Sequence, residues 1–214
     1  MRLIASRGFA ALSKPRCGST SLRRAIDPHL NVAAGDLAID RADQHPALHP
    51  HIPGPYLRKV LERPALDLII TVRHPVDMLW SYYKFFQPDG RGRYNFHPRW
   101  HGRNPPDFET WILKGKVGFT ADWQTEAPDR ITPDDLSPLG LDARAATKDG
   151  TLVARVFRIE EPGPLEAWLS DRLRTDVTLA VENRSDKAER PELGAKAMDR
   201  IRAMLPLDAD IYGL

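Results

Sequence analysis

The sequence predicts an α/β fold in which helices flank a central parallel sheet, giving three layers. Residues 66–72, LDLIITV, are nearly all apolar and β-branched, and residues 151–157, TLVARVF, form a second strand-like run. A continuous apolar run is typical of a strand that is buried on both faces of a parallel sheet. Helical patterns alternate with the strands, and such alternation is typical of parallel sheets with right-handed crossovers.

The first strand is expected in the short apolar run GFAALS, residues 8–13. After a turn-like segment, SLRRAI at residues 21–26 opens a helix in which Leu22 and Ile26 lie four residues apart. A helix is also expected after the strand at 66–72, because Pro75 is well placed as a first helical residue. Its apolar stripe has the spacing i, i+3, i+4 and i+7 and consists of Val76, Leu79, Trp80 and Tyr83.

Three more elements are expected after the strand at 151–157. Pro162 starts a helix whose apolar face consists of Leu165, Trp168, Leu169 and Leu173. Residues 176–181, DVTLAV, are predicted to form the last strand. A C-terminal helix is predicted from a stripe of Leu193, Ala197, Ile201 and Leu205.

The length and composition indicate one ordinary globular domain. The chain has 214 residues, of which 42% are hydrophobic and 28% charged, and it is long enough to bury a proper core. Residues 87–150 do not follow the strand–helix alternation and are rich in Pro, Gly, Arg and aromatic residues. We therefore expect a single domain over residues 1–214, with an insertion at about 87–150.

Charge and cysteine content exclude several classes of protein. The net charge is only +2, so no nucleic-acid partner is expected. No run approaches the roughly 20 apolar residues of a membrane helix, and Arg7 and Gly8 interrupt the N-terminal segment too early for a secretory leader. Cys17 is the single cysteine, which excludes an internal disulfide and favours a cytoplasmic location.

The stretch SKPRCGSTSLRRAI, residues 13–26, indicates phosphate binding. Free N–H groups and the positive end of a helix dipole face such a loop, and Gly18 lets the backbone approach an anion closely. Further donors are the side chains of Lys14, Arg16, Ser19, Thr20 and Ser21. The alternative is that Ser19 only caps the helix. The stretch is not a Walker A loop, because Ser13 and Pro15 replace the required glycine and hydroxyl residue.

A second anion-binding element is expected after the strand at 66–72. Arg73 stands at its carboxyl end, and Ser81 lies about two turns into the next helix. Ligands of parallel sheets bind at the carboxyl ends of the strands, so Arg73 is expected to face the same crevice as the loop. An arginine and a helix hydroxyl can bind a separate phosphate. The alternative is a surface ion pair between Arg73 and Asp77.

Together the two segments resemble the PAPS-dependent sulfotransferases, especially the carbohydrate-type branch; PAPS is 3′-phosphoadenosine 5′-phosphosulfate. The 5′-phosphosulfate loop of that family is P-K-x-G-[ST]-[ST]-S-L, and PRCGSTSL at residues 15–22 departs from it at one position. The 3′-phosphate element is R-x-P-x₅-S-x-Y, and RHPVDMLWSYY at residues 73–83 matches it throughout. Weaker similarities follow in VFRIEE, ENRSD and the closing DADIYGL.

The resemblance implies a P-loop-like fold that transfers the sulfuryl group of PAPS as co-substrate, with no metal. It assigns cofactor binding to Arg16, Cys17, Gly18, Ser19, Thr20, Ser21, Arg73 and Ser81. Arg16 replaces the family lysine that stabilises charge on the bridging oxygen, and a guanidinium is a planar fork rather than a point charge. Arg16 is favoured for this catalytic role, and Lys14 is the alternative.

His51 is the catalytic base that the resemblance implies. HIPGPYLRKVL, residues 51–61, is similar to the family stretch G-H-[LI]-x-x-x-x-L-R, whose histidine is the proposed base. Histidine titrates in the range that deprotonation of an acceptor requires. A metal site of His45, His49 and His51 is disfavoured by the intervening prolines. Glu160 or Glu161 could serve as the base instead, although a salt bridge or a helix start is the favoured role for both.

Residues 87–104, QPDGRGRYNFHPRWHGRN, interleave arginines with aromatic residues. This mixture suits single-stranded nucleic acid, but equally a sugar that stacks on a ring beside anionic groups. Given the two phosphate elements, we expect the segment to bind the acceptor, a small molecule, an anionic glycan or a lipid at a membrane surface. The alternative is a solvated loop.

Two other functions stay open. A protein that binds the nucleotide but has lost catalysis would explain Arg16. A phosphatase with Cys17 as nucleophile would use the spacing Cys-x₅-Arg, which CGSTSLR provides with Arg23. The 3′-phosphate element has no place in a phosphatase of this kind.

Overall fold

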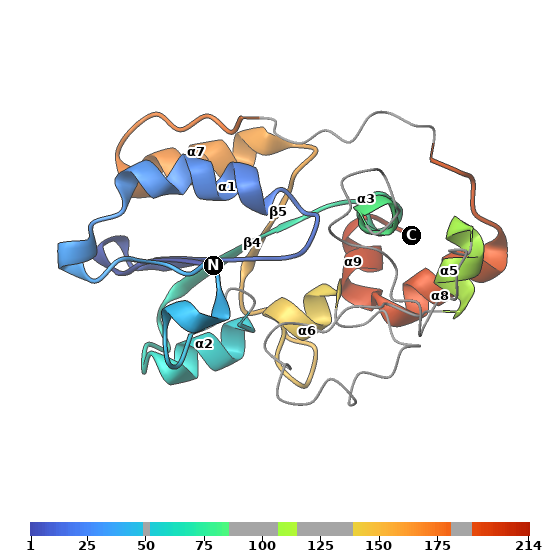
Figure 1. Ribbon diagram of the computed structural model, residues 1–214, viewed down its shortest axis with the longest axis horizontal. Helices are drawn as coiled ribbons and strands as arrows, with labels where there is room; N and C mark the ends of the chain where they lie inside the picture. Colours follow the sequence, from blue (N-terminus) through green and yellow to red (C-terminus); the bar gives the residue numbers. More distant parts are fainter. Residues whose placement is uncertain (49–51, 86–106, 115–138, 181–189) are drawn as a thin grey trace. The chain divides into compact units, whose positions relative to one another are not determined.

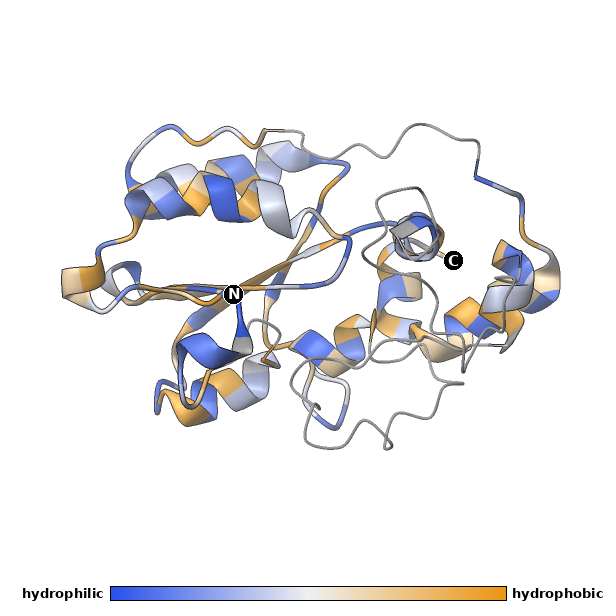
Figure 2. Ribbon diagram, viewed as in Figure 1, coloured by the Kyte–Doolittle hydropathy of each residue, from blue (hydrophilic) through white to orange (hydrophobic). Residues whose placement is uncertain are grey.

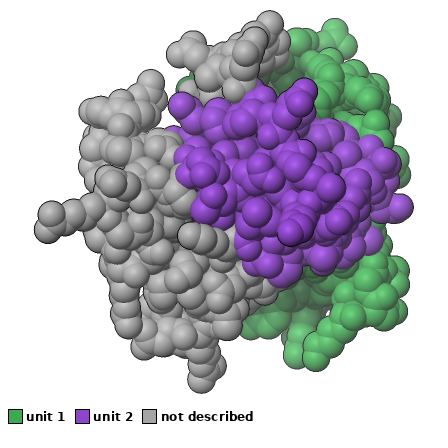
Figure 3. All heavy atoms as spheres, turned by 90° about the vertical axis from the view of Figure 1, so that its right-hand side faces the viewer, with its two compact units in different colours: residues 1–73, 141–184 green, residues 74–140, 185–214 purple. Residues whose placement is uncertain are grey.

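The computed structural model describes residues 1–48, 52–85, 107–114, 139–180 and 190–214. The chain divides into two compact units, each built from two segments (Figure 3). Unit 1 comprises Met1–Arg73 and Leu141–Arg184, and unit 2 comprises His74–Gly140 and Ser185–Leu214. Much of the predicted insertion at 87–150, including the basic and aromatic segment 87–104, lies outside the described residues.

Unit 1 contains a five-stranded sheet in the order β3-β1-β2-β4-β5 (Figure 1). The strands are β1 Arg2–Ile4, β2 Phe9–Leu12, β3 Leu37–Ala38, β4 Asp67–Val72 and β5 Arg155–Arg158. β2, β4 and β5 are parallel to one another, whereas β1 is antiparallel to both β2 and β3. The sheet is therefore mixed, and the prediction of a wholly parallel central sheet is wrong.

The short connection between β1 and β2 explains the antiparallel pairing. Ala5–Arg7 form one 3-10 turn, and Gly8, with a φ of 72°, completes the link. A parallel pair needs a crossover of roughly a dozen residues or more, so a link this short permits only a hairpin. The parallel strands β2, β4 and β5 are joined by much longer stretches that contain helices.

Helices cover both faces of the sheet in unit 1. α1 (Ser19–Ile26) and α7 (Pro162–Leu173) lie on one face, and α2 (Gly54–Val60) and α6 (Leu141–Ala145) lie on the other (Figure 1). Polar and apolar residues alternate around the turns of α1 and α7 (Figure 2), as expected for helices that bury one stripe. Short 3-10 turns also occur at Asp27–His29, Val32–Ala34 and Ala42–Gln44. The predicted α/β class, with a sheet flanked by helices, is confirmed.

Alternate residues of the strands serve the two faces of the sheet. The core under α1 and α7 is apolar and includes Phe9, Ala11, Ile69, Phe157, Leu22, Ile26, Leu165, Leu169 and Leu173. On the other face α2 approaches closely at Gly54, where a Cβ atom would lie 2.9 Å from Leu68 Cδ1 and 3.0 Å from Leu12 Cδ1. A larger residue at Gly54 would require the side chains of Leu68 and Leu12, or α2 itself, to shift.

Unit 2 is helical in its described part. Its helices are α3 (Pro75–Phe85), α5 (Phe108–Lys114), α8 (Ala195–Met204) and α9 (Pro206–Ile211). Aromatic rings pack α3 against α5: Trp80 meets Phe108 of α5 edge-on, with centroids 5.0 Å apart, and Trp80 also stacks on Tyr83 within α3 at 5.6 Å. Trp111 of α5 is buried and lies 5.8 Å from Tyr83. Aromatic pairs of this geometry add about 0.5–1.5 kcal/mol each beyond their area burial.

Local sequence patterns predict most of these elements correctly. The runs at 8–13 and 66–72 contain β2 and β4, and the helices predicted at Pro75 and Pro162 are α3 and α7. Of the C-terminal stripe, Ala197 and Ile201 lie in α8, whereas Leu193 precedes this helix and Leu205 is its C-cap; Pro206 then starts a separate helix, α9. A proline cannot continue a helix through its interior, so the chain turns there.

Two predicted strands differ from the structure. Of residues 151–157 only Arg155–Phe157 join the sheet, because Leu152 instead forms an isolated bridge with Ala146. Residues 176–180, the described part of the predicted last strand, form no strand. Their amide groups bond to side chains of α7: Val177 N–H donates to Ser170 Oγ and Leu179 N–H to Glu166 Oε1. These bonds occupy backbone donors that a sheet ladder would need.

Candidate functional site

The carboxyl ends of three parallel strands form one edge of the sheet in unit 1. The loop Ser13–Gly18 follows β2, Arg73 follows β4 and Ile159 follows β5. Ile159 N–H donates to Val72 C=O at 2.9 Å, so β4 and β5 remain paired up to this edge. The loop and Arg73 therefore share the edge at which ligands of parallel strands bind, as the sequence predicts.

The loop begins with a tight turn over residues 14–17. Cys17 N–H donates to Lys14 C=O at 3.4 Å, which places Pro15 and Arg16 at the two central positions. Arg16 has a φ of 60°. A turn with proline second and a left-handed third residue is of type II, in which the third residue is normally glycine.

Arg16 differs in context from the other left-handed residues. Among the described non-glycine residues, Glu62 and Arg174 also have positive φ values, but both follow the last turn of a helix. Left-handed residues are common at helix ends. Arg16 has no such explanation, and a left-handed non-glycine residue costs about 1–2 kcal/mol. Strain of this kind is concentrated at functional sites.

Gly18 meets two separate requirements of the loop. Its φ is 74°, and a Cβ atom at this position would lie 3.1 Å from Ile159 Cγ2. The positive φ disfavours any residue with a side chain. The short distance to Ile159 shows that the loop lies close to the end of β5. Gly18 is thus the residue through which the loop packs against the neighbouring strand.

The amino end of α1 opens directly from this loop. Its N-cap residue is Gly18, which has no side chain that could cap the first turn. Ser19 is the first helical residue rather than the cap, so the alternative in which Ser19 only caps the helix is not realised. Ser19, Thr20 and Ser21 are partly exposed, and the first N–H groups of a helix lack intrahelical partners. The helix dipole adds positive potential at this end.

Lys14 and Cys17 are both fully buried beneath the loop. Lys14 Nζ lies 3.8 Å from Cys17 Sγ, whereas Arg16 is partly exposed. The two candidate cations thus lie in different environments, one inside the protein and one at its surface. Burial also removes Cys17 from direct attack on a substrate, and Arg23, the other member of the Cys-x₅-Arg pattern, pairs with Asp40 at 2.7 Å. Both features disfavour the phosphatase.

Arg73 is partly exposed at the end of β4. Among the residues that the structure describes, its side chain makes no hydrogen bond or ion pair. Asp77, its partner in the alternative interpretation, is paired with Arg190 at 3.1 Å. A guanidinium with five donors is thus left for a ligand at the same edge as the loop.

Ser81 has a different setting from Arg73. Arg73 belongs to unit 1, whereas Ser81 lies on α3 in unit 2 and is only 3% exposed. Sequence spacing relates the two residues through one continuous helix, but the division into units falls between Arg73 and His74. The shared phosphate role of Arg73 and Ser81 stays a prediction.

The candidate catalytic bases, the histidines and glutamates, differ in what the structure shows of them. His51 and His49 lie outside the described residues, whereas His45 Nδ1 accepts hydrogen bonds from the N–H groups of Ala47 and Leu48, both at 3.1 Å. His45 therefore stabilises a local turn. Glu161 forms an exposed ion pair with Arg158 at 3.3 Å, the surface role that the sequence favours for it. No group of three potential metal ligands occurs within the described part of the chain.

Sequence reasoning missed Thr71. This residue is 2% exposed, and its hydroxyl donates to Cys17 C=O at 2.5 Å. The signal was present in LDLIITV, where Thr71 is the polar residue among the buried apolar ones. A hydroxyl inside an apolar strand needs a partner, and here the partner is the candidate loop.

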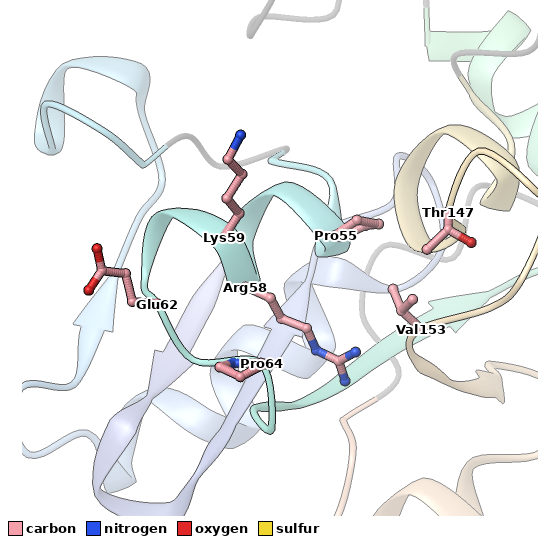
Figure 4. A pocket seen from close by; sticks show the side chains of 7 residues that line it. All are labelled: Pro55, Arg58, Lys59, Glu62, Pro64, Thr147 and Val153. Carbon is pink, nitrogen blue, oxygen red and sulfur yellow. The ribbon is translucent and has the colours of Figure 1, made fainter.

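A shallow hollow of about 410 Å³ lies elsewhere on unit 1, beside α2 (Figure 4). It is lined by Pro55, Arg58, Lys59, Glu62, Pro64, Thr147 and Val153. Arg58 uses its guanidinium to hold Leu66 C=O, at 2.9 and 3.1 Å, just before β4 begins. Its charged group thus stabilises the fold and is not available to a ligand in the hollow.

Comparison of the chain with models of known protein families, with curated proteins and with solved structures found no match. None of the described helices is long and apolar enough to cross a membrane.

Proposed function

We propose that the chain is a PAPS-dependent sulfotransferase with a P-loop-like fold. One observation carries this proposal: the strained loop, the amino end of α1 with Gly18 as its N-cap, and Arg73, which has no ion pair among the described residues, share the carboxyl edge of three parallel strands. Backbone donors and cations at one edge suit a dianionic phosphate or phosphosulfate group. The proposed acceptor is a hydroxyl or amine of a carbohydrate or glycolipid, and the proposed location is the cytoplasm.

In the proposed reaction the acceptor oxygen attacks sulfur in line with the bond that breaks. The S–O bond to the 5′-phosphate is cleaved, its electron pair stays on the phosphate oxygen, and adenosine 3′,5′-bisphosphate leaves. The N–H groups at the start of α1 bind the phosphosulfate, and Arg16, or Lys14 as the alternative, stabilises the charge on the bridging oxygen. His51 takes the proton of the acceptor.

The decisive experiment has two parts. Binding of adenosine 3′,5′-bisphosphate is measured by calorimetry, and transfer of sulfur-35 from labelled PAPS is measured against a panel of glycans and glycolipids. The proposal predicts both binding and transfer. Absence of bisphosphate binding would remove it.

The second candidate is a protein that binds the nucleotide without catalysis. The observation that favours it is Arg16, which stands where the family has lysine. It predicts tight binding of the bisphosphate together with no transfer to any acceptor. The variant Arg16→Lys separates the two cases. If the wild type is inactive because Arg16 replaces the family lysine, Arg16→Lys should gain transfer activity. If the wild type is an enzyme, it already has this activity.

A further inference from the structure

Thr71 is a buried polar group that the proposed reaction does not use. It lies in β4 between Ile70 and Val72, paired in register with Phe157 of β5, and is 2% exposed. Side chains two residues apart share a face of a strand, so Thr71 is on the same face as Ile69, under α1. A valine would fill this position with nearly the same shape. Packing alone therefore does not require threonine at this position, and the role of its hydroxyl lies in the hydrogen bond that it donates.

The hydrogen bond of Thr71 fixes one peptide group of the loop. Its hydroxyl donates to Cys17 C=O at 2.5 Å, and the described chain contains no cis peptide bond. In a trans peptide group the C=O and N–H bonds point in opposite directions. Because Cys17 C=O is held toward β4, Gly18 N–H must point away from Thr71. Among the described residues, Gly18 N–H has no hydrogen-bond acceptor.

The backbone conformation of Arg16, Cys17 and Gly18 makes the direction of Gly18 N–H important for anion binding. Arg16 and Gly18 are left-handed, with φ values of 60° and 74°, and Cys17 between them is not. Alternation of backbone hand makes successive N–H groups converge on an anion. A rotation of the Cys17–Gly18 peptide would replace the Gly18 donor with the Cys17 carbonyl oxygen, which repels an anion. The hydroxyl of Thr71 opposes this rotation.

We propose that Thr71 is a positioning residue: its hydroxyl holds the Cys17–Gly18 peptide so that Gly18 N–H donates to the 5′-phosphate end of the nucleotide. This inference rests on the proposed function, since it names how that site is kept ready for its ligand. Thr71 itself touches no ligand in this scheme.

The test compares Thr71→Val with Thr71→Ser, using two nucleotides that differ only at the 5′ position. For adenosine 3′,5′-bisphosphate, loss of the hydroxyl should weaken binding by roughly 10–100-fold, the effect of one hydrogen bond to a charged group. For adenosine 3′-phosphate, which has no 5′-phosphate, binding should be unchanged. Thr71→Ser restores the hydroxyl and should recover the bisphosphate affinity to within about twofold.

A second measurement on the same variants uses NMR to follow the backbone ¹⁵N–¹H signal of Gly18 as nucleotide is added. In the wild type and in Thr71→Ser this signal should shift when the bisphosphate is added, and not when adenosine 3′-phosphate is added. Equal loss of affinity for both nucleotides in Thr71→Val would indicate a general structural role and overturn the inference. If Thr71→Val does not fold, the wild-type spectra decide: an unshifted Gly18 signal overturns it.

The failure of this inference is distinguishable from the failure of the proposed function. If the wild type binds neither nucleotide and transfers no sulfur-35, the sulfotransferase proposal fails and the role of Thr71 fails with it. If the wild type binds the bisphosphate and Thr71→Val binds it equally well, the role of Thr71 alone is wrong.

Discussion

The two sides of the sheet in unit 1 treat their charged groups differently. On the antiparallel side, the buried guanidinium of Arg2 is bonded to Asp27 and Asp40, and Asp40 also pairs with Arg23. At the carboxyl edge of the parallel strands, Arg73 has no ion pair among the described residues, and Arg16 has a strained backbone. Charges that the fold pairs internally contribute to stability, whereas the guanidinium of Arg73, which has no ion pair among the described residues, is available for a ligand.

This comparison predicts that substitutions on the two sides affect different measurements. Variants at the carboxyl edge should change binding or turnover without lowering the free energy of unfolding. Variants on the antiparallel side should do the reverse. A variant that both destabilises the fold and weakens binding or turnover would break the comparison.

The largest effect is expected for Arg16→Ala. Its charge should matter most in the transition state, so turnover of PAPS should fall by about 10²–10³-fold while affinity for the bisphosphate falls far less. Initial rates and calorimetry measure the two quantities. Arg16→Lys, which restores the family residue, should keep activity or raise it. If Arg16→Ala keeps full turnover and Lys14→Ala loses it, the buried lysine and not Arg16 stabilises the charge on the bridging oxygen.

Arg73→Ala should act on binding instead. An arginine–phosphate contact is worth roughly 1.5–3 kcal/mol, so affinity for adenosine 3′,5′-bisphosphate should fall by about 10–100-fold. Affinity for adenosine 5′-phosphate should hardly change, because the 3′-phosphate is the assigned partner. Stability should also stay the same, since Arg73 has no described ion pair to lose. Equal losses for both nucleotides would remove the assignment.

Arg2→Ala is the counterpart on the antiparallel side. It removes charge-assisted hydrogen bonds to Asp27 and Asp40, and its buried stem also packs, so the free energy of unfolding should fall by roughly 1.5–3 kcal/mol. Bisphosphate affinity should be unchanged. Arg41→Ala is the matched control, because Arg41 pairs with Asp43 at an exposed site and such pairs contribute about 0–1 kcal/mol. Urea unfolding of both variants checks the difference.

The sequence predicts the position of the loop and of Arg73 after parallel strands better than it predicts how the strands of the sheet pair. β4, α3 and α7 are continuous or strictly periodic patterns, and each therefore has a recognisable local signal. β1 is only three residues long, Arg2–Ile4, too short for a period, and its antiparallel pairing depends on the link to β2. The bonds of Ser170 and Glu166 to residues 177 and 179 are tertiary, and no local pattern indicates them.

The candidate site shows the same division between local and tertiary information. The phosphate loop and Arg73 follow strands directly, so their place at one edge could be read from the order of elements. The burial of Ser81 and Lys14 could not, because it depends on helices and loops distant in sequence. Thr71 is intermediate: its polarity in an apolar strand is visible, but its partner Cys17 is 54 residues away.

The ion pairs of the antiparallel side also predict a pH dependence. Hydrogen bonds from Arg2, opposed in part by burial, lower the pKa of Asp40 from 3.8 to about 2. Because the folded pKa is depressed, the stabilisation is complete above about pH 4 and is lost as the pH falls through about 2. Asp40 is 39% exposed, so after allowance for solvent screening we expect about 1 kcal/mol. Asp40→Asn should abolish this dependence in urea unfolding between these pH values, and an unchanged dependence would contradict the assignment.

The smallest effects concern the three left-handed residues. Glu62 and Arg174 end helices, so glycine at either position should relieve backbone strain at no functional cost. The relief of about 1–2 kcal/mol is partly offset by the entropy of glycine in the unfolded chain, about 0.5–1 kcal/mol, and a net gain of roughly 0.5–1 kcal/mol is expected.

Arg16→Gly should give a similar gain in stability, because its φ is nearly the same as that of Glu62 and Arg174. It should nevertheless lose turnover as Arg16→Ala does, since glycine removes the cation. The three variants are compared by thermal unfolding and by PAPS turnover. We expect glycine at positions 62 and 174 to stabilise the fold with full activity. We expect glycine at position 16 to stabilise the fold but to abolish activity. This result would show that the backbone strain at positions 62 and 174 only ends a helix, whereas the strain at position 16 places a charge. A destabilised Arg16→Gly would mean that the Arg16 side chain holds the fold together, and the comparison between the two sides of the sheet would fail at its most important residue.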